Sequence, residues 1–225
     1  MRVGTTAGML AVIAYDALAR PRMLEWGSTA QERRQPLPGD DIIDVVMTHC
    51  TRAVTIDAPP EAVWPWLVQI GDRRAGFYSY DWVERFVFGG TVHYIERTQS
   101  ATRVHPELQD VQLGDRINTG SVGRLAIGNP VTVLEPDHAL VIGTWAFVLE
   151  PPPGQRTRLL VRERDAGWLR LLAPRRFGLA RAAASLVDYV VAEPLHFAMV
   201  HKMMFGLKQR AEQARARPRS PSRRR

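Results

Sequence analysis

The chain has a single cysteine, Cys50, among its 225 residues, so it cannot form an intramolecular disulfide. It also has no CxxC pair and no cysteine and histidine cluster spaced like a structural zinc site. GxSxG, Walker and GxGxxG sequences are missing too, which argues against a serine hydrolase of that type and against nucleotide binding. We therefore predict no bound metal and no cofactor, and the low cysteine content favours a cytoplasmic protein.

A general excess of basic residues is also missing, although the formal net charge is +7. Residues 1–207 hold 22 basic and 22 acidic side chains, so the whole excess lies from Lys208 onward, in a stretch that ends RARPRSPSRRR. Residues 213–225 have almost no apolar side chains to offset the entropy of ordering, and we predict that they are disordered. We expect no specific nucleic-acid binding. A solubilising tail, or weak contact with an anionic lipid or nucleic-acid surface, are the alternatives.

The apolar run at the N-terminus, AGMLAVIA (residues 7–14), has only eight residues and is too short to span a bilayer. It continues as a helical pattern that we expect to end at Pro21, and the helix is predicted to pack on the domain. The alternative is peripheral contact of residues 7–18 with the inner face of the membrane, assisted by the Arg-rich tail. Residues 25–46, which include PLPGDD, are typical of an extended arm, so residues 1–46 form an N-terminal helix and arm.

Alternating apolar and polar residues predict strands over residues 51–57, 131–136, 139–151 and 157–164, with a tight turn at Gly143. The last three are separated by connections too short for a crossover helix, so they form an antiparallel meander. Helices are predicted over residues 60–71, bent at Pro65, and from Asp81 onward. A long helix over residues 175–215, interrupted at Pro194, completes an α+β protein in which one sheet curls around a helix.

Five segments carry a resemblance to a known superfamily. They are RAVTIDAPPEAVWPWLVQIG (52–71), RAGFYSYDWVER (74–85), HPELQDVQLGD (105–115), RTRLLVRER (156–164) and EPLHFAMVHKMMFGLKQRAE (193–212). The chain resembles the SRPBCC superfamily of START-like, polyketide-cyclase/dehydrase-like proteins, and within it a group of actinobacterial proteins of unassigned activity. The resemblance implies a helix-grip fold over residues 47–212, in which a curved antiparallel sheet wraps around a long C-terminal helix and two short helices close one end.

The resemblance further implies an internal cavity that binds a hydrophobic small molecule, such as a lipid, a quinone or a polyketide-like compound, in a carrier or sensor. The candidate ligand-binding residues come from the elements that surround this cavity. They are Trp64, Leu67, Tyr78, Tyr80, Trp82, Trp145, Phe147, Arg162, His196, Met199 and Met203. Ordinary core packing is the alternative for each, and Tyr78, Tyr80 and Trp82 need polar partners if they are buried.

An enzyme is the alternative to a carrier. A histidine that titrates near neutrality, beside a tyrosine hydroxyl, can move protons in a cyclisation or dehydration. The candidates for such a cyclase-like or dehydratase-like enzyme are His196 with Tyr80 or Tyr189. The competing interpretation is that a neighbouring acid or carbonyl group satisfies His196. The sequence makes no prediction of oligomeric state.

Overall fold

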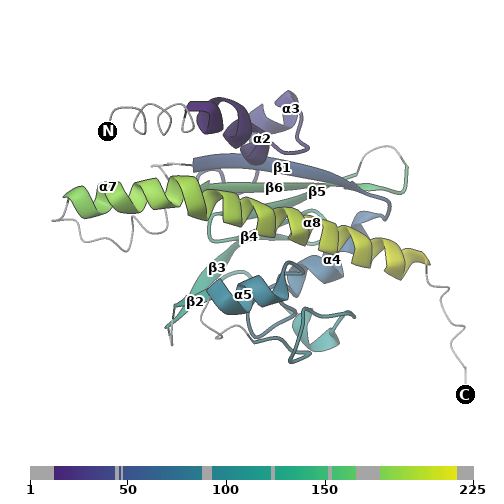
Figure 1. Ribbon diagram of the computed structural model, residues 1–225. Coiled ribbons are helices and arrows are strands. Elements are labelled where there is room, and N and C mark those ends of the chain that lie inside the picture. Colours follow the sequence, from purple (N-terminus) through teal and green to yellow (C-terminus); the bar gives the residue numbers. More distant parts are fainter. Residues whose placement is uncertain are drawn as a thin grey trace, which may run out of the picture.

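The centre of the protein is a six-stranded antiparallel sheet in the order β1-β6-β5-β4-β3-β2 (Figure 1). The computed structural model describes residues 13–43, 46, 48–87, 93–122, 125–151, 154–165 and 178–216. The strands are β1 (Thr48–Ile56), β2 (Arg116–Val122), β3 (Leu125–Glu135), β4 (Ala139–Ile142), β5 (Trp145–Glu150) and β6 (Thr157–Asp165). Strands β2 to β6 form a meander that is longer than predicted, and β4 and β5 meet at the expected tight turn, where Gly143 has a φ of +61°.

A long helix crosses one face of this sheet, as Figure 1 shows. It consists of α7 (Gly178–Val187), the π-helical turn η3 (Asp188–Ala192) and α8 (Glu193–Ala216). Two shorter helices, α4 (Pro60–Val68) and α5 (Asp81–Val87), and the 3₁₀ turn η2 (Pro106–Leu108) lie toward the β2 side of the sheet. This is the helix-grip arrangement, so the predicted fold class is confirmed.

The predicted interruption of the long helix at Pro194 is wrong. Proline has no N–H to donate to the carbonyl four residues earlier, which is that of Val190. The turn that precedes α8 is π-helical, with a wider hydrogen-bond spacing, and such turns accommodate local breaks in the ladder. The helix therefore continues from α7 into α8.

The N-terminal segment is more helical than predicted. It contains the π-helical turn η1 (Tyr15–Ala19), α2 (Arg20–Leu24) and α3 (Ala30–Arg34). Pro21 does not end the first helix but lies in the first turn of α2, where its missing N–H costs nothing. A capping box formed by Thr29 and Glu32 starts α3 within the segment that was expected to be an extended arm. Residues 7–12 of the apolar run lie outside the described residues.

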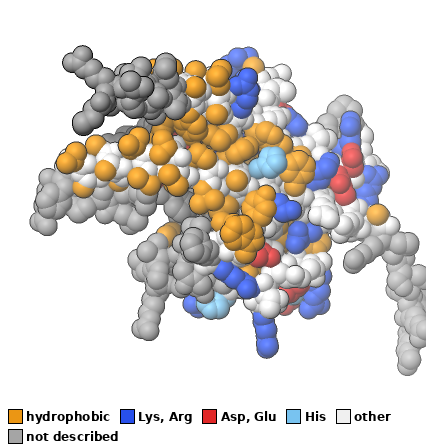
Figure 2. All heavy atoms as spheres, in the orientation of Figure 1, with side chains coloured by type: hydrophobic (Ala, Val, Ile, Leu, Met, Phe, Trp, Pro, Cys, Tyr) orange, Lys and Arg blue, Asp and Glu red, His pale blue; other side chains and the backbone are white. Residues whose placement is uncertain are grey.

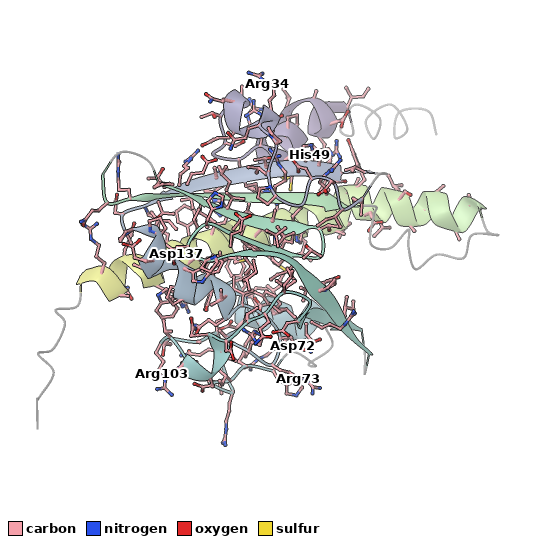
Figure 3. All side chains as sticks on the ribbon, turned by 180° about the vertical axis from the view of Figure 1, so that it is seen from behind. Arg34, His49, Asp72, Arg73, Arg103 and Asp137 are labelled. Carbon is pink, nitrogen blue, oxygen red and sulfur yellow. The ribbon has the colours of Figure 1, made fainter. Side chains whose placement is uncertain are left out.

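Both faces of the sheet are covered. The main core lies on the inner face, where Val54, Leu149 and Leu159 pack with residues of α8 such as Met203 and Leu207. On the outer face, Leu37 of the N-terminal arm packs against Ala53, Val148, Leu160 and Ala139. Seen from behind, Arg34 of α3 lies at one edge of the molecule, and Asp72, Arg73 and Arg103 lie in loops near the opposite edge (Figure 3).

Candidate functional site

Strand register places a group of polar and aromatic side chains at the end of the sheet where β1 and β5 begin and β6 ends. Glu163 of β6 lies directly opposite Cys50 of β1 on one side and Trp145 of β5 on the other. Arg52 lies two residues beyond Cys50, on the same face, because side chains of a strand alternate between faces. We name Cys50, Arg52, Trp145, Glu163 and His196, which approaches from α8, the sheet-end cluster.

Glu163 connects the polar members of the sheet-end cluster. Its Oε2 accepts hydrogen bonds from Arg52 Nη1 at 3.2 Å and from the Cys50 thiol at 3.5 Å, and its Oε1 lies 3.3 Å from His196 Nε2. The exposed fraction of the side chain rises from 1% for Arg52 to 16% for Glu163 and 33% for His196. The cluster is therefore a buried ion pair with a histidine on its solvent side.

This arrangement fixes the chemical role of each group. Burial, reinforced by the charge of Glu163, raises the pKa of the Cys50 thiol, which therefore stays protonated and is a poor nucleophile. A carboxylate beside an imidazole nitrogen orients the ring, and a ring held in this way can exchange a proton with a bound group. Within the described ranges, no three His, Cys, Asp or Glu side chains are grouped as metal ligands would be.

Aromatic rings cover the same end of the sheet. The ring of Trp145 lies 4.8 Å from that of Phe147, 6.5 Å from Phe77 in a stacked arrangement and 6.3 Å from His196. The indole Nε1 of Trp145 is buried and has no hydrogen-bond partner among the described residues. A buried donor without a partner costs about 1–3 kcal/mol, so this N–H can gain free energy from an acceptor that a ligand supplies.

The structure brings part of the predicted set together. The ring of Trp145 lies beside those of Phe147 and His196, and Met199 lies one turn along α8 from His196. Arg52, Glu163 and Phe77 complete the site and were missed. For Arg52 the signal is phase, because it has the parity of the core residues Val54 and Ile56. Glu163 has the parity of Leu159 and Val161, but Leu160, of the other parity, is buried as well, so phase gives no signal there.

Other predicted residues lie in the core. Leu67 and Phe147 are fully buried, Met203 is 1% exposed and Tyr78 is 2% exposed. Trp64 is partly buried and packs against the same core. These side chains belong to one core cluster. Two surface hollows of about 530 and 500 Å³ are lined by none of the predicted ligand-binding residues.

Arg162 lies on the outer face of the sheet, away from the sheet-end cluster. Its guanidinium donates to Thr51 Oγ1, to Asp40 Oδ2 at 2.7 Å and to three carbonyl oxygens of the arm. Those carbonyls belong to Glu32, Arg33 and Gln35. Arg162 therefore anchors the N-terminal arm, and its place between two inward-facing residues follows from strand alternation.

The exposed aromatic candidates lie elsewhere. Trp82 is 72% exposed and Tyr80 is 39% exposed, with Lys202 Nζ 5.9 Å from the centre of the Tyr80 ring. Tyr189 lies on η3, where its ring is 5.2 Å from that of Tyr15 and its hydroxyl donates to Asp16. The predicted partner of His196 was a tyrosine hydroxyl. The structure instead places the carboxylate of Glu163 against its ring.

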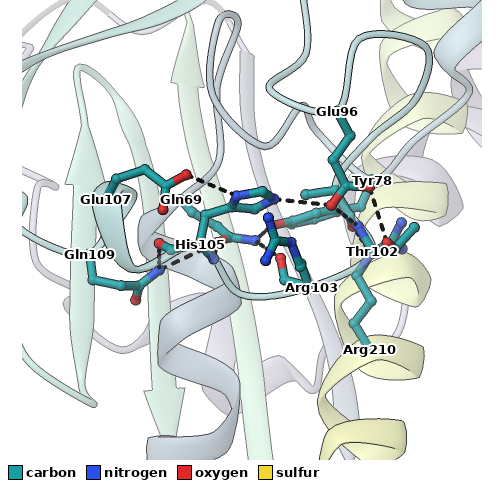
Figure 4. A network of polar contacts seen from close by, with 10 residues as sticks. Gln69, Tyr78, Glu96, Thr102, Arg103, His105, Glu107, Gln109 and Arg210 are labelled. Carbon is teal, nitrogen blue, oxygen red and sulfur yellow. Dashed lines mark hydrogen bonds and ion pairs between the residues drawn. The ribbon is translucent and has the colours of Figure 1, made fainter.

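Tyr78 belongs to a buried polar network between α4, η2 and α8 (Figure 4). Its hydroxyl donates to the Trp66 carbonyl at 3.0 Å and accepts from Gln69 Nε2 at 2.8 Å. Gln69 in turn accepts from the backbone N–H of His105, whose ring lies between Glu96 and Glu107 at 3.0 and 3.2 Å. Because the Tyr78 hydroxyl already donates and accepts, the network holds loops in place and leaves this group unavailable to a ligand.

No protein-family profile matches the chain, and no curated protein is significantly similar to it. Solved structures similar to it include a polyketide_cyc-like protein from Corynebacterium glutamicum, with 14% identity, 70% of this chain and 90% of that chain covered, and a TM-score of 0.37. An AHSA1-like protein from Aeromonas hydrophila has 16% identity, coverage of 76% and 97%, and a TM-score of 0.33. A conserved protein of unknown function from Enterococcus faecalis has 13% identity, coverage of 79% and 77%, and a TM-score of 0.32.

The order of elements in this chain, with its meander and its long C-terminal helix, establishes the fold by itself. The actinobacterial subgroup stays a prediction. At the level of the fold, the chain has the α+β helix-grip arrangement that the resemblance implies.

Proposed function

We propose that the protein binds a hydrophobic small molecule with one hydrogen-bond acceptor at the sheet-end cluster, as a carrier or sensor. The observation that carries this proposal is the buried Trp145 Nε1, which has no partner among the described residues. A lipid carboxyl, a quinone carbonyl or a polyketide carbonyl would each supply the acceptor it lacks.

The surroundings of Trp145 suit such a ligand. Phe77 and Phe147 flank the indole and give apolar contact area, and His196 is one-third exposed at the solvent side. Binding sites for small molecules combine this kind of apolar lining with a few placed polar groups. The polar groups here are the Trp145 N–H and the imidazole of His196.

The first test is native mass spectrometry of freshly purified protein, with identification of any small molecule that leaves it. The second is calorimetric titration with three probes that carry an acceptor, namely decanoic acid, menadione and quercetin. Trp145→Phe keeps the aromatic ring but removes the donor, so it should weaken binding about 3- to 10-fold, equivalent to about 1 kcal/mol. Trp82→Phe is the matched control and should bind as the wild type does, because Trp82 is 72% exposed.

Equal losses in the two variants would place the ligand away from Trp145. No copurified molecule and no saturable binding of any probe would refute the carrier or sensor.

The pairing of His196 with Glu163 at 3.3 Å favours a second candidate, a cyclase-like or dehydratase-like enzyme. In it, His196 would exchange a proton with the bound substrate while Glu163 orients the ring. His196→Ala separates the candidates: an enzyme should keep ligand binding and lose turnover, whereas a carrier should lose a modest part of its affinity. A product that accumulates equally with wild type and His196→Ala would rule out this role.

A further inference from the structure

Exposed hydrophobic side chains gather on one part of the molecule. Of the thirteen exposed large hydrophobic residues in the described part, eight lie on residues 13–24 and 178–195, which we name the projecting helix pair. They are Ile13, Leu18, Leu179, Leu186, Val187, Val190, Val191 and Leu195. Figure 2 shows hydrophobic side chains covering α7 and the N-terminal helix and continuing toward the middle of this face. Single exposed apolar residues are ordinary, but a continuous patch marks an interaction surface.

Polar contacts hold the two helices of the pair together. Tyr15 donates its hydroxyl to the Tyr189 carbonyl at 3.0 Å, and Arg20 pairs with Glu193 at 2.9 Å. The Arg20 guanidinium also lies 4.9 Å from the centre of the Tyr189 ring. These polar groups face one another within the pair, and the exposed surface around them is mainly aliphatic, with Asp16 and Arg22 as exposed charged residues.

The composition of the long helix suits a lipid environment. The continuous helix Gly178–Ala216 contains an 18-residue window with a mean hydropathy of 1.2, of which only 6% is buried in the protein. The part of this helix that precedes α8, namely α7 and η3, has 10 and 5 residues and so spans about 22 Å at 1.5 Å per residue. Beyond it, Glu193 and His196 are tied to Arg20 and Glu163. Because the hydrocarbon core is about 30 Å thick, this part would lie in the interface rather than cross the bilayer.

Charge distribution favours an anionic lipid surface over a second protein. Residues 166–195 contain four arginines, Arg170, Arg175, Arg176 and Arg181, and two acidic residues, Asp188 and Glu193, of which Glu193 pairs with Arg20. Stable attachment to a membrane commonly combines an apolar insertion with basic residues that bind anionic headgroups, and this chain supplies both.

We propose that the projecting helix pair docks on an anionic bilayer, with its aliphatic side chains in the headgroup and acyl boundary. The proposal is independent of the ligand at the sheet-end cluster. The sequence predicted membrane contact through residues 7–18, whereas here the main element is the long helix. Five of the eight exposed residues lie on α7 and η3, and a sixth is Leu195 of α8.

The test is flotation of the full-length protein with vesicles of phosphatidylcholine and phosphatidylglycerol at 7:3. The Leu186→Glu, Val190→Glu double variant changes residues that are 56% and 41% exposed, and it should bind at least 10-fold more weakly. The matched control is Leu113→Glu, Ile127→Glu, which adds the same charge at residues that are 67% and 36% exposed outside the pair. It should bind within about twofold of the wild type. Circular dichroism checks that both variants are folded.

Three results would overturn the proposal. The first is that the wild type fails to float with the vesicles, and the second is that the two double variants bind the vesicles equally well. The third is that vesicle binding disappears completely in 0.5 M NaCl, because charge alone would then explain the binding. Sedimentation velocity adds a direct alternative: a dimer that the Leu186→Glu, Val190→Glu variant dissociates, with no vesicle binding, would assign the surface to a second copy of the chain.

Discussion

Replacement of Arg162 by lysine keeps the positive charge but removes the planar group that anchors the N-terminal arm. The arginine is 2% exposed and makes five hydrogen bonds, to Thr51, to Asp40 and to three arm carbonyls, of which that of Glu32 lies at 2.8 Å. A lysine ammonium has three donor hydrogens on one atom, so at least two acceptors lose their partner. At about 1.5 kcal/mol for each buried acceptor, we expect a loss of about 3 kcal/mol in the free energy of unfolding.

The measurement is urea unfolding followed by tryptophan fluorescence and circular dichroism, with thermal unfolding as a second readout. For a chain of this size, a loss of 3 kcal/mol lowers the melting temperature by about 6–12 °C. Arg34→Lys is the control, because Arg34 is exposed on α3 and the same chemical change should cost less than about 0.5 kcal/mol there. The reasoning fails if Arg162→Lys costs less than 1 kcal/mol. It also fails if Arg162→Lys weakens ligand binding at unchanged stability, since that would place the side chain in the ligand site.

Two further predictions concern α5 and α8. Burial, with Asp81 and Asp72 nearby, raises the pKa of Glu84 to about 7 from a usual 4.5. The folded state then holds a proton that the unfolded state has lost, so stability should fall between pH 4.5 and 7 by up to about 3 kcal/mol. Urea unfolding at several pH values should show that this slope is reduced in Glu84→Gln, and an unchanged slope would contradict the assignment. A Cβ at Gly206 would lie 2.3 Å from the Tyr78 carbonyl oxygen, so Gly206→Ala should cost about 1–3 kcal/mol or more. Gly178→Ala, which meets nothing within 4 Å, should instead be neutral or stabilising in the same thermal unfolding assay, and similar melting temperatures for the two variants would refute this.

The fold could be predicted because its signals are local. Alternation over residues 157–164 and the apolar pattern of the C-terminal helix each specify an element, and short connections between strands then allow only an antiparallel meander. The hairpin of β2 and the first half of β3 was missed because INTGSVGRLAIGN is rich in glycine and polar residues and lacks a regular alternation. The capping box of α3 was also present in the sequence, as Thr29 and Glu32, but it precedes no apolar run that would mark a helix.

The site was less predictable because α5 and β6 depend on tertiary contacts. Trp82 and Tyr80 lie in an aromatic segment that looks like core, and only the way α5 packs leaves them exposed. On β6, Leu159 and Val161 have one parity and Leu160 the other, so both parities contain buried apolar residues. The sequence therefore could not decide whether Arg162 or Glu163 faces α8, and the choice of Arg162 followed from residue type rather than from phase.

That ambiguity has a physical cause in the N-terminal arm. In a sheet with one solvated face, outward positions are polar and the phase of each strand can be read directly. Here Leu37 covers Leu160 and Val148 on the outer face, and Arg158 donates to Glu32 at 2.7 Å beside them. The outer face of β6 is thus buried by a segment more than a hundred residues earlier in the chain. Arg162 can be buried there because the arm supplies four acceptors. Glu163 can be partly buried on the other face because Arg52 of the neighbouring strand β1 pairs with its charge. Two adjacent residues of opposite charge are therefore each neutralised by a different layer. Since the arm holds Arg162, the sheet-end cluster keeps a single buried cation, Arg52, on the inner face of β1 and β6 among the described residues.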